Sequence, residues 1–298
     1  MPKPRYPIYV PTKARADRPL TAKLFASEHI DFRLVVEPQE VEAYFEWKDY
    51  LLVLPENNRG LVFARNWIRD HSVAQGAERH WQFDDDIQGM QRFQAARRVK
   101  CPVGTAMAAA EDFVDRYENV GLASFNSTFF NTVLSNGTYS KRSMTHFPPF
   151  YLNARCYTDF LMLNSLPNRW RYRYNEDTDM TLQVLASGWC TVLFNSFLIS
   201  TPATLTQPGG QMQHMYGGDG RLKMARELER VWPGVVKTGR RFNRPQHQVK
   251  GHWQLFDTPL KLKSGVELPT EPNEYGLQLV AKKEVRDAKL RKWYEDHK

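Results

Sequence analysis

The sequence predicts an α/β fold in which a mostly parallel central sheet is flanked by helices. Short apolar runs alternate with segments of helical spacing over residues 1–100, and these runs end at a proline or at charged residues. Strands that alternate with helices of this length are joined by crossovers, which place the strands in parallel. The 298 residues are 42% hydrophobic and 25% charged, as in globular proteins that bury a core.

Four strands and three helices are predicted in this first part of the chain. The strands cover residues 6–12, 32–37, 50–54 and 80–83, and the helices cover residues 18–28, 40–47 and 61–72. Ligands of parallel sheets bind at the carboxyl ends of the strands, so the polar residues that follow these strands are expected to meet in one crevice. They are residues 12–15, Glu37, residues 57–59 and the triplet Asp84-Asp85-Asp86.

The rest of the chain has a less regular pattern. The predicted elements are a hairpin at residues 91–100, a helix at 106–117, one or two strands within 150–163, a helix at 177–186 and a strand at 191–199. Residues 207–220 are rich in glycine and predict a loop. Further helices are predicted at residues 219–231 and 281–297.

Several classes of protein are excluded by what the sequence lacks. The three cysteines are odd in number and form no CxxC pair, so neither a disulfide framework nor a structural zinc site is expected. The start of the chain lacks the apolar core of a signal peptide, and no stretch of about 20 apolar residues predicts a membrane span. No P-loop, GxSxG or HExxH pattern is present. We expect a soluble protein of the cytoplasm, with no membrane contact and no protein partner.

The formal net charge of +8 comes from the C-terminal end. Residues 221–298 contain 18 basic and 10 acidic side chains, whereas residues 1–220 are balanced. Within residues 221–250 aromatic residues stand between the basic ones, a pattern typical of contacts to nucleic-acid phosphates. A solvated helix face followed by a basic loop is the alternative. The candidate DNA contacts are Lys237, Arg240, Arg241 and Arg244.

The triplet Asp84-Asp85-Asp86 is the strongest indication of a functional site in the sequence. Three adjacent carboxylates repel one another, and this cost makes sense where a hard divalent cation is bound. Mg²⁺ or Mn²⁺ would take these oxygen ligands and bridge to a diphosphate. A solvated acidic turn is the alternative, which the position directly after a buried strand makes less favourable.

A second acidic cluster, residues 175–179, stands at the start of a predicted helix. Acidic residues are favourable near the positive end of the helix dipole, so a capping role is one explanation. The other is a general base for a hydroxyl nucleophile, and Asp177 and Asp179 are both candidates. His214, in the glycine-rich loop, is either a surface residue or a metal ligand.

Four segments carry a resemblance to a known family: YPIYVPTKAR, VVEP, LPENNRGLVFARN and WQFDDDI. They resemble GT-A-type glycosyltransferases, which have a Rossmann-like sheet and a DxD motif for the metal and the sugar nucleotide. More closely, they are similar to the TET-associated glycosyltransferases of bacteriophages. The resemblance spans about residues 6–220 and is densest before residue 87. It implies a GT-A-like catalytic domain over residues 1–220, followed by a basic extension over residues 221–298 that packs on it and contacts DNA.

The resemblance also implies roles for individual residues. Asp84 and Asp86 fill the DxD positions and would bind the metal together with His214. Glu176 and Asp177 match the acidic pair on the acceptor side, with Asp177 as the candidate base. The residues that would surround the donor nucleotide are Thr12, Lys13, Arg15, Glu37, Arg59, Arg65, Asp84 and Asp85. The extra carboxylate of Asp85 leaves the division of roles within the triplet open.

The implied activity is the metal-dependent transfer of a sugar from a UDP-sugar to the hydroxyl of a 5-hydroxymethylated pyrimidine in DNA, with 5-hydroxymethylcytosine as the first candidate. Mn²⁺ or Mg²⁺ would neutralise the charge on the leaving diphosphate. Three alternatives stay open: a glycosyltransferase with a saccharide or small-molecule acceptor, a nucleotidyltransferase, and a non-catalytic DNA-binding module. The expected location is the cytoplasm, that of the infected bacterium if a phage encodes the protein.

Overall fold

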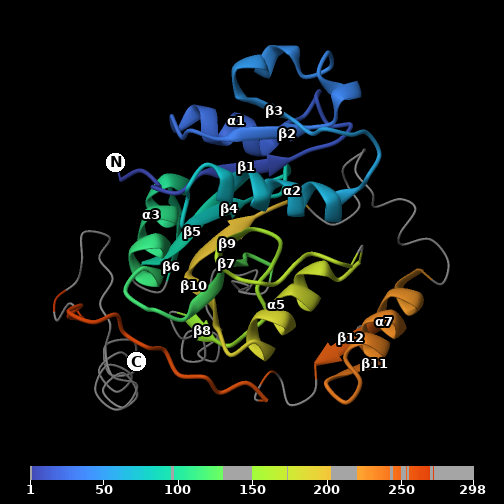
Figure 1. Cartoon of the computed structure of the whole chain (residues 1–298). Coiled ribbons are helices and arrows are strands. Elements are labelled where there is room, and N and C mark those ends of the chain that lie inside the picture. The colour runs from blue at the N-terminus through green and yellow to red at the C-terminus, as the bar shows by residue number, and fades with distance from the viewer. Residues whose placement is uncertain are drawn as a thin grey trace.

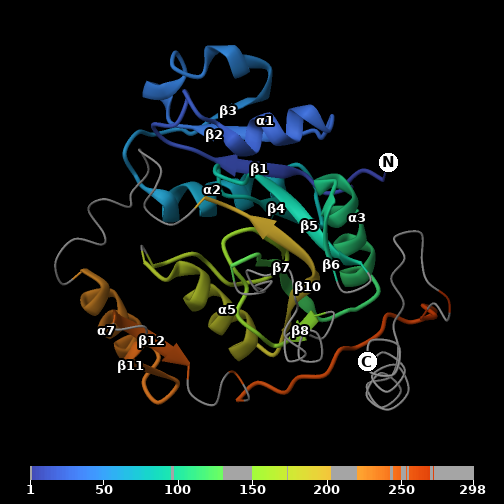
Figure 2. The same ribbon diagram turned by 180° about the vertical axis from the view of Figure 1, so that it is seen from behind.

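One mixed ten-stranded sheet organises the molecule, and helices cover both of its faces (Figure 1; Figure 2 gives the view from behind). The structure is a computed structural model. It describes residues 2–94, 97–129, 150–172, 174–202, 220–241, 244–249, 253, 255–268 and 271. None of the described helices is long and apolar enough to cross a membrane.

The strands of the sheet follow a spatial order that differs from their order in the chain. Along the sheet they are β3 (Leu51–Val53), β2 (Arg33–Val36), β1 (Ile8–Pro11), β4 (Arg79–Gln82), β9 (Phe160–Leu163), β7 (Val120–Ser127), β10 (Cys190–Ser200), β5 (Gly89–Gln94) and β6 (Arg97–Cys101). Strand β8 (Phe150–Leu152) pairs with β10 off this path. The expected hairpin at residues 91–100 is confirmed as β5 and β6, and residues 150–163 contain two strands, β8 and β9.

The mostly parallel centre of the sheet is confirmed. Strands β3, β2, β1 and β4 are mutually parallel, and β7 and β10 form a second parallel pair. Strand β9 runs antiparallel between β4 and β7. In this register Gln82 lies opposite Phe160, so the chain just before β9 meets the chain just after β4. The antiparallel insertion therefore brings two distant segments to one edge of the sheet.

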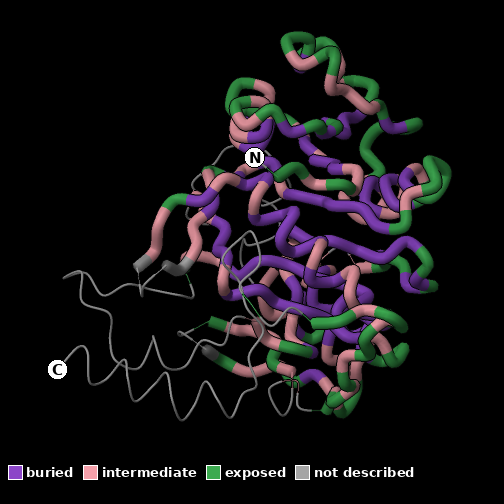
Figure 3. The backbone as a smooth tube through the Cα atoms, turned by 90° about the vertical axis from the view of Figure 1, so that its left-hand side faces the viewer, coloured by how far each residue is buried: buried purple, intermediate pink, exposed green. Residues whose placement is uncertain are grey.

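Helices pack on both faces of the sheet, and most residues of the central strands are buried (Figure 3). They are α1 (Leu20–Ser27), α2 (Leu61–Ala74), α3 (Val103–Val114) and α5 (Glu176–Ala186). Ala64 and Ile68 of α2 pack on Tyr9 and Val35. On the other face, α1 and α3 cover a cluster that includes Trp81. Because both faces are covered, the central strands are buried on both faces rather than alternating between buried and exposed, and even the polar side chains Arg79, His80 and Gln82 of β4 are buried.

The helix predicted at residues 40–47 is instead two 3₁₀ helices, η1 (Pro38–Glu40) and η2 (Phe45–Tyr50). The residues that pack on the core here are Val41, Tyr44, Trp47 and Tyr50. They are spaced by three, which is the repeat of a 3₁₀ helix and not that of an α-helix. Burial of these side chains sets the period, and the expectation of one α-helix was wrong for that reason.

The described part of the basic extension begins with α7 (Gly220–Val231), which is followed by a hairpin of β11 (Val236–Arg241) and β12 (Arg244–Val249). This unit lies beside α5 (Figure 1), and Leu228 and Val236 share an apolar cluster with Leu182 of α5. After the hairpin, Lys261 and Pro259 hydrogen-bond the side chain of Asn119 at the start of β7. The extension thus packs against the sheet domain at two places. The glycine-rich segment 207–219 and the helix predicted at residues 281–297 lie outside the described residues.

Candidate active site

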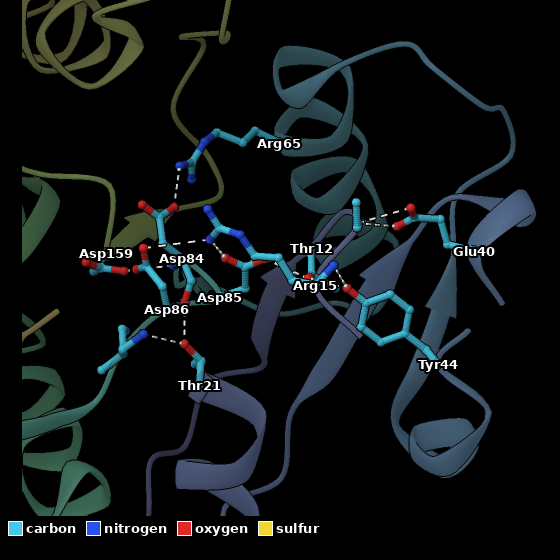
Figure 4. A network of polar contacts seen from close by, with 12 residues as sticks. Thr12, Arg15, Thr21, Glu40, Tyr44, Arg65, Asp84, Asp85, Asp86 and Asp159 are labelled. Atoms are coloured by element: carbon cyan, nitrogen blue, oxygen red, sulfur yellow. Dashed lines mark hydrogen bonds and ion pairs between the residues drawn. The ribbon is translucent and has the colours of Figure 1, made fainter. Parts of the chain in front are cut away.

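The acidic triplet stands where β4 ends, and the start of α1 holds its backbone (Figure 4). The hydroxyl of Thr21 donates a hydrogen bond of 2.6 Å to the backbone carbonyl of Asp84 and accepts one of 2.9 Å from the backbone N–H of Ile87. The backbone N–H of Thr21 donates to the carbonyl of Asp85. These bonds close a tight turn, so the three carboxylates leave the backbone in different directions.

The carboxylate of Asp85 points back into the protein. Its Oδ2 accepts a 2.6 Å hydrogen bond from the hydroxyl of Thr12, and its Oδ1 forms an ion pair with Arg15. Thr12 in turn hydrogen-bonds the hydroxyl of Tyr44, which also accepts from the backbone N–H of Arg15 (Figure 4). Burial raises the pKa of Asp85, and Arg15 opposes that effect. Asp85 therefore fixes the turn after β1 to the turn after β4.

Asp84 and Asp86 keep exposed carboxylate surface, with 37% and 24% of the side chain accessible. Arg65 of α2 lies 3.2 Å from Oδ1 of Asp84, and its guanidinium is fully buried over the rings of Phe160 and Trp170. Burial, with repulsion from Asp84 and Asp85, raises the pKa of Asp86 to about 6. These two carboxylates face outward from the end of β4.

Asp159, which the sequence analysis did not single out, is a fourth carboxylate in this place. It precedes β9, and its Oδ1 accepts a 2.8 Å hydrogen bond from the backbone N–H of Asp84. Burial and the negative charge of Asp84 raise the pKa of Asp159 well above its ordinary value. The sequence shows a single Asp in a polar stretch, and only the antiparallel pairing of β9 with β4 brings it here.

The donor set at the end of β4 fits a hard divalent cation. Asp84 and Asp86 offer carboxylate oxygens, the ligands that Mg²⁺ and Mn²⁺ prefer, and the mutual repulsion around them is what a cation would relieve. The described residues contain no group of three or more His, Cys, Asp or Glu side chains that could hold a metal ion. His214, the third expected ligand, lies outside the described residues. Further ligands would have to come from there or from a bound diphosphate.

The ends of β1, β2 and β3 form a polar group next to the triplet. Nζ of Lys13 lies 2.7 Å from Oε2 of Glu37 and 2.8 Å from Oδ1 of Asn58. Burial alone would raise the pKa of Glu37, but the hydrogen bonds from Lys13 and from the backbone of Asn58 hold it below its ordinary value. Arg59 points elsewhere: it is half exposed, pairs with Glu56 and lies over the ring of Phe63.

The second acidic cluster forms the first turn of α5, where the two members of the acidic pair have different surroundings. Asp177 is buried, and Arg155 donates to its Oδ2 from Nε at 3.1 Å and from Nη2 at 2.5 Å. Its Oδ1 accepts a 2.7 Å hydrogen bond from the backbone N–H of Thr178. Although burial raises the pKa of Asp177, Arg155 outweighs this and lowers it.

The pKa of Glu176 is shifted in the opposite direction to that of Asp177. Burial and the negative charge of Asp177 raise the pKa of Glu176 to about 7, and the charges of Arg65 and Asp84 also act on it. Glu176 thus shares an electrostatic environment with the end of β4, although the two lie far apart in the chain. The structure brings together the two acidic clusters that the sequence showed separately.

The expected DNA contacts lie on the β11–β12 hairpin. Lys237, Arg240 and Arg244 are exposed, and Arg241 pairs with Arg244 across the hairpin. Two residues that sequence reasoning missed, His247 and Arg155, lie close to Asp177. An arginine after a short strand and a histidine in a basic segment carry no pattern that would have identified them.

Comparison with known proteins identifies the family to which the chain belongs. A family model described as TET-Associated Glycosyltransferase matches residues 6–210. No curated protein matches the chain. Among solved structures, a CMP:2-keto-3-deoxy-manno-octonic acid synthetase complexed with CTP aligns with 76% of this chain and 99% of its own, at 11% sequence identity and a TM-score of 0.38, which supports no conclusion about activity. The family model spans well over half of the chain, and the protein therefore belongs to the TET-associated glycosyltransferase family and is a glycosyltransferase.

Proposed function

We propose that this enzyme transfers a sugar from a UDP-sugar to the hydroxyl group of a 5-hydroxymethylated pyrimidine in DNA, with Mn²⁺ or Mg²⁺ as cofactor. The observation that carries the proposal is the group of carboxylates at the end of β4, which shares its electrostatic environment with Glu176. Membership of the TET-associated glycosyltransferase family supports the acceptor. The basic hairpin beside α5 supports a polyanionic substrate.

The donor nucleotide would bind along the ends of β1, β2 and β4. Thr12 and Arg15 hold the loop after β1 against Asp85, and Lys13 holds it against Glu37, so these loops are fixed before substrate arrives. Asp84 and Asp86 would hold the cation, with His214 as a further candidate ligand. When bound, the cation supplies charge neutralisation for the leaving diphosphate.

We assign the general base to Glu176 rather than to Asp177. Both oxygens of Asp177 already accept hydrogen bonds, and Arg155 lowers its pKa, which makes Asp177 a weak base with no free position. The pKa of Glu176 is about 7, near the value that suits proton transfer in neutral solution. Glu176 would accept the hydroxyl proton as that oxygen bonds to the anomeric carbon and the bond from the sugar to the diphosphate breaks.

The acceptor base would reach this site from the side of α5. A hydroxymethyl group in a duplex lies in the major groove, so deep access requires that the base leave the stack. The exposed cations of the hairpin, Lys237, Arg240 and Arg244, would meanwhile contact backbone phosphates. Helix α5, most of whose residues are buried, would lie between the two and set their separation.

Mass spectrometry of digested DNA tests this function. Hydroxymethylated DNA is incubated with a panel of UDP-sugars and Mn²⁺, and unmodified DNA of the same sequence is the control. We expect one hexose-type mass increment on the hydroxymethylated nucleoside and equimolar UDP release. UDP release that is indifferent to hydroxymethylated DNA would instead indicate a saccharide acceptor, and pyrophosphate would indicate nucleotidyl transfer.

A further inference from the structure

The first turn of α5 carries the acidic pair but lacks a side-chain cap. Asn175, its N-cap residue, has a left-handed backbone with φ of 54° and makes no capping hydrogen bond to the helix. Without such a bond, the first backbone N–H groups of a helix are poorly restrained. Within the turn, Oδ1 of Asp177 accepts a hydrogen bond from the backbone N–H of Thr178, and further contacts to the turn come from outside the helix.

Besides accepting a 3.3 Å hydrogen bond from Nδ2 of Asn175 at the carbonyl of Met224, the basic extension supplies two polar side-chain contacts to this turn. Nε2 of His247 on β12 lies 3.1 Å from the hydroxyl of Thr178, which is fully buried. Burial and the charge of Arg155 lower the pKa of His247 to about 4, so the imidazole is neutral at pH 7 and Nε2 can share a hydrogen bond with the hydroxyl. Thr178 is also the residue whose backbone N–H bonds Asp177.

The second contact comes from the end of α7. Nε1 of Trp232 donates a 2.7 Å hydrogen bond to Oδ1 of Asp179, which is 1% exposed. Arg171 adds two hydrogen bonds of 2.9 Å to the same carboxylate and lies over the Trp232 ring. Asp179 is therefore held from outside the helix, while its backbone N–H bonds the carbonyl of Asn175.

An apolar cluster keeps both contacts in place. Leu182 of α5 packs with Leu228 and Val236, and Trp232 and Val249 pack against them. In the hairpin, Val236 lies opposite Val249 and Thr238 lies opposite His247, so one register brings the apolar and the polar contacts to α5 together. All of the partners from the extension lie beyond residue 210, where the family match ends.

We propose that His247 and Trp232 are positioning residues that orient the acidic pair of α5, so that the basic extension completes the catalytic site. The inference rests on the proposed role of Glu176 as the base. The hairpin that bears the exposed cations is the same element that holds Thr178. Phosphate contacts on the outer side of the hairpin therefore affect the orientation of Glu176. This couples DNA binding to the chemical step.

Kinetics of three single variants test the proposal. Trp232→Phe keeps an aromatic ring but removes the indole N–H, and His247→Leu removes the bond to Thr178. Each is expected to lower kcat by about 10-fold while KM for the UDP-sugar stays unchanged, because misplacement of a catalytic group affects the chemical step. His247→Gln places an amide nitrogen near the position of Nε2 and is expected to recover most of the lost kcat.

Trp253→Phe is the matched control, because it removes an indole N–H at the periphery of the same apolar cluster. It is expected to keep the wild-type kcat. Thr178→Val combined with His247→Leu should cost no more than Thr178→Val alone, since Thr178→Val already removes the bond that His247→Leu removes. Equal losses for Trp253→Phe and Trp232→Phe, additive losses in the double variant, or wild-type kcat in Trp232→Phe and His247→Leu would each overturn the proposal.

Amide hydrogen exchange distinguishes a failure of this proposal from a failure of the proposed function. Trp232→Phe and His247→Leu are expected to speed exchange at residues 178–182 by about 10-fold while the strands of the central sheet keep their protection. Should the wild-type enzyme transfer no sugar to hydroxymethylated DNA, the proposed function fails, and exchange still decides whether the extension restrains α5. Unchanged exchange at residues 178–182 in both variants would reject the restraint itself.

Discussion

The two ends of strand β4 both carry charge, and they balance it in different ways. At the start of β4, Arg79 is buried, donates 2.9 Å to the carbonyl of Val120 and lies 3.2 Å from Oδ1 of Asp115. Arg5 bonds Asp112 and the same Asp115, while Glu111 accepts from the backbone of Arg5 and from the indole of Trp81. Each carboxylate at this end has a positive or N–H partner within the fold.

At the other end of β4 the negative charge exceeds what the fold supplies to balance it. Arg65 pairs with Asp84, Arg15 pairs with Asp85 and lies 3.7 Å from Asp86, and yet the pKa values of Asp85, Asp86, Asp159 and Glu176 are all raised. At this end the carboxylates outnumber the arginines that face them, and clusters with perturbed pKa values are common at functional sites. We therefore expect the start of β4, the paired end, to contribute stability, and the other end, called the unpaired end because its carboxylates outnumber its arginines, to bind a ligand.

The largest effect is expected from Asp86→Asn. The amide keeps the shape of the side chain but removes charge from the cation site, so turnover should fall by about 1,000-fold. The free energy of unfolding should stay the same or rise, because a repelled carboxylate is lost. UDP release with titrated Mn²⁺ and thermal unfolding measure the two quantities. Asp112→Asn, at the paired end of β4, is the control and should keep activity; wild-type turnover in Asp86→Asn would remove Asp86 from the site.

Glu176→Gln is expected to lower kcat by about 100-fold, because the amide cannot accept the proton. In the wild-type enzyme kcat should rise with pH through about 7, the pKa of Glu176, as the carboxylate form appears. The variant should lose this rise. A pH–rate profile at saturating substrates measures it, and a rise of the same size in Glu176→Gln would reassign the base.

The same residue links pH to stability. The pKa of Glu176 is raised in the folded state, so the folded protein binds more protons than the unfolded chain between about pH 4.5 and pH 7. Stability from this group is present below that window and is lost as the pH rises through it. Glu176→Gln should therefore unfold at a higher temperature than wild type at pH 8 and at a similar temperature at pH 4.5. The opposite order would mean that Glu176 gains a partner on folding.

The unpaired end of β4 could be predicted from the sequence better than the paired end. The triplet follows a buried strand directly, and the polar residues after β1, β2 and β3 meet there because parallel strands end at one edge. Asp159 could not be predicted, since its place depends on the antiparallel pairing of β9 with β4. Nor could the difference between Glu176 and Asp177, which depends on Arg155 from a loop 22 residues away.

The helices and strands could be predicted from the sequence where the periodicity of apolar residues agrees with their burial in the structure. Strands β1 to β4 and helices α2 and α5 lie within a few residues of the predicted ranges. Strand β7 was missed, because it lies in a charge-free stretch with glycine and asparagine and is buried on both faces, so it shows no alternation. The β11–β12 hairpin was missed because its strands are basic and gain their apolar contact from α5 and α7.

Arg79→Met tests the paired end of β4. The change leaves the carbonyl of Val120 and the carboxylate of Asp115 without their partner, so the free energy of unfolding should fall by about 3 kcal/mol. The kcat of the folded enzyme should change by less than about twofold, because the cluster at the other end is untouched. Urea unfolding and turnover below the transition measure both. A large loss of kcat with little loss of stability would show that the two ends of β4 do not divide function in this way.

The smallest effects are expected on the hairpin, where charge is exposed rather than buried. Lys237→Ala and Arg244→Ala should each weaken DNA binding by a few-fold at moderate salt and reduce the slope of log affinity against log salt by about 1, because each removes one phosphate contact. Stability should not change. Fluorescence anisotropy of labelled DNA at several salt concentrations measures the slope. If the slope stays the same in both variants, these cations do not contact the phosphates, and the hairpin acts on the acidic pair of α5 without binding DNA.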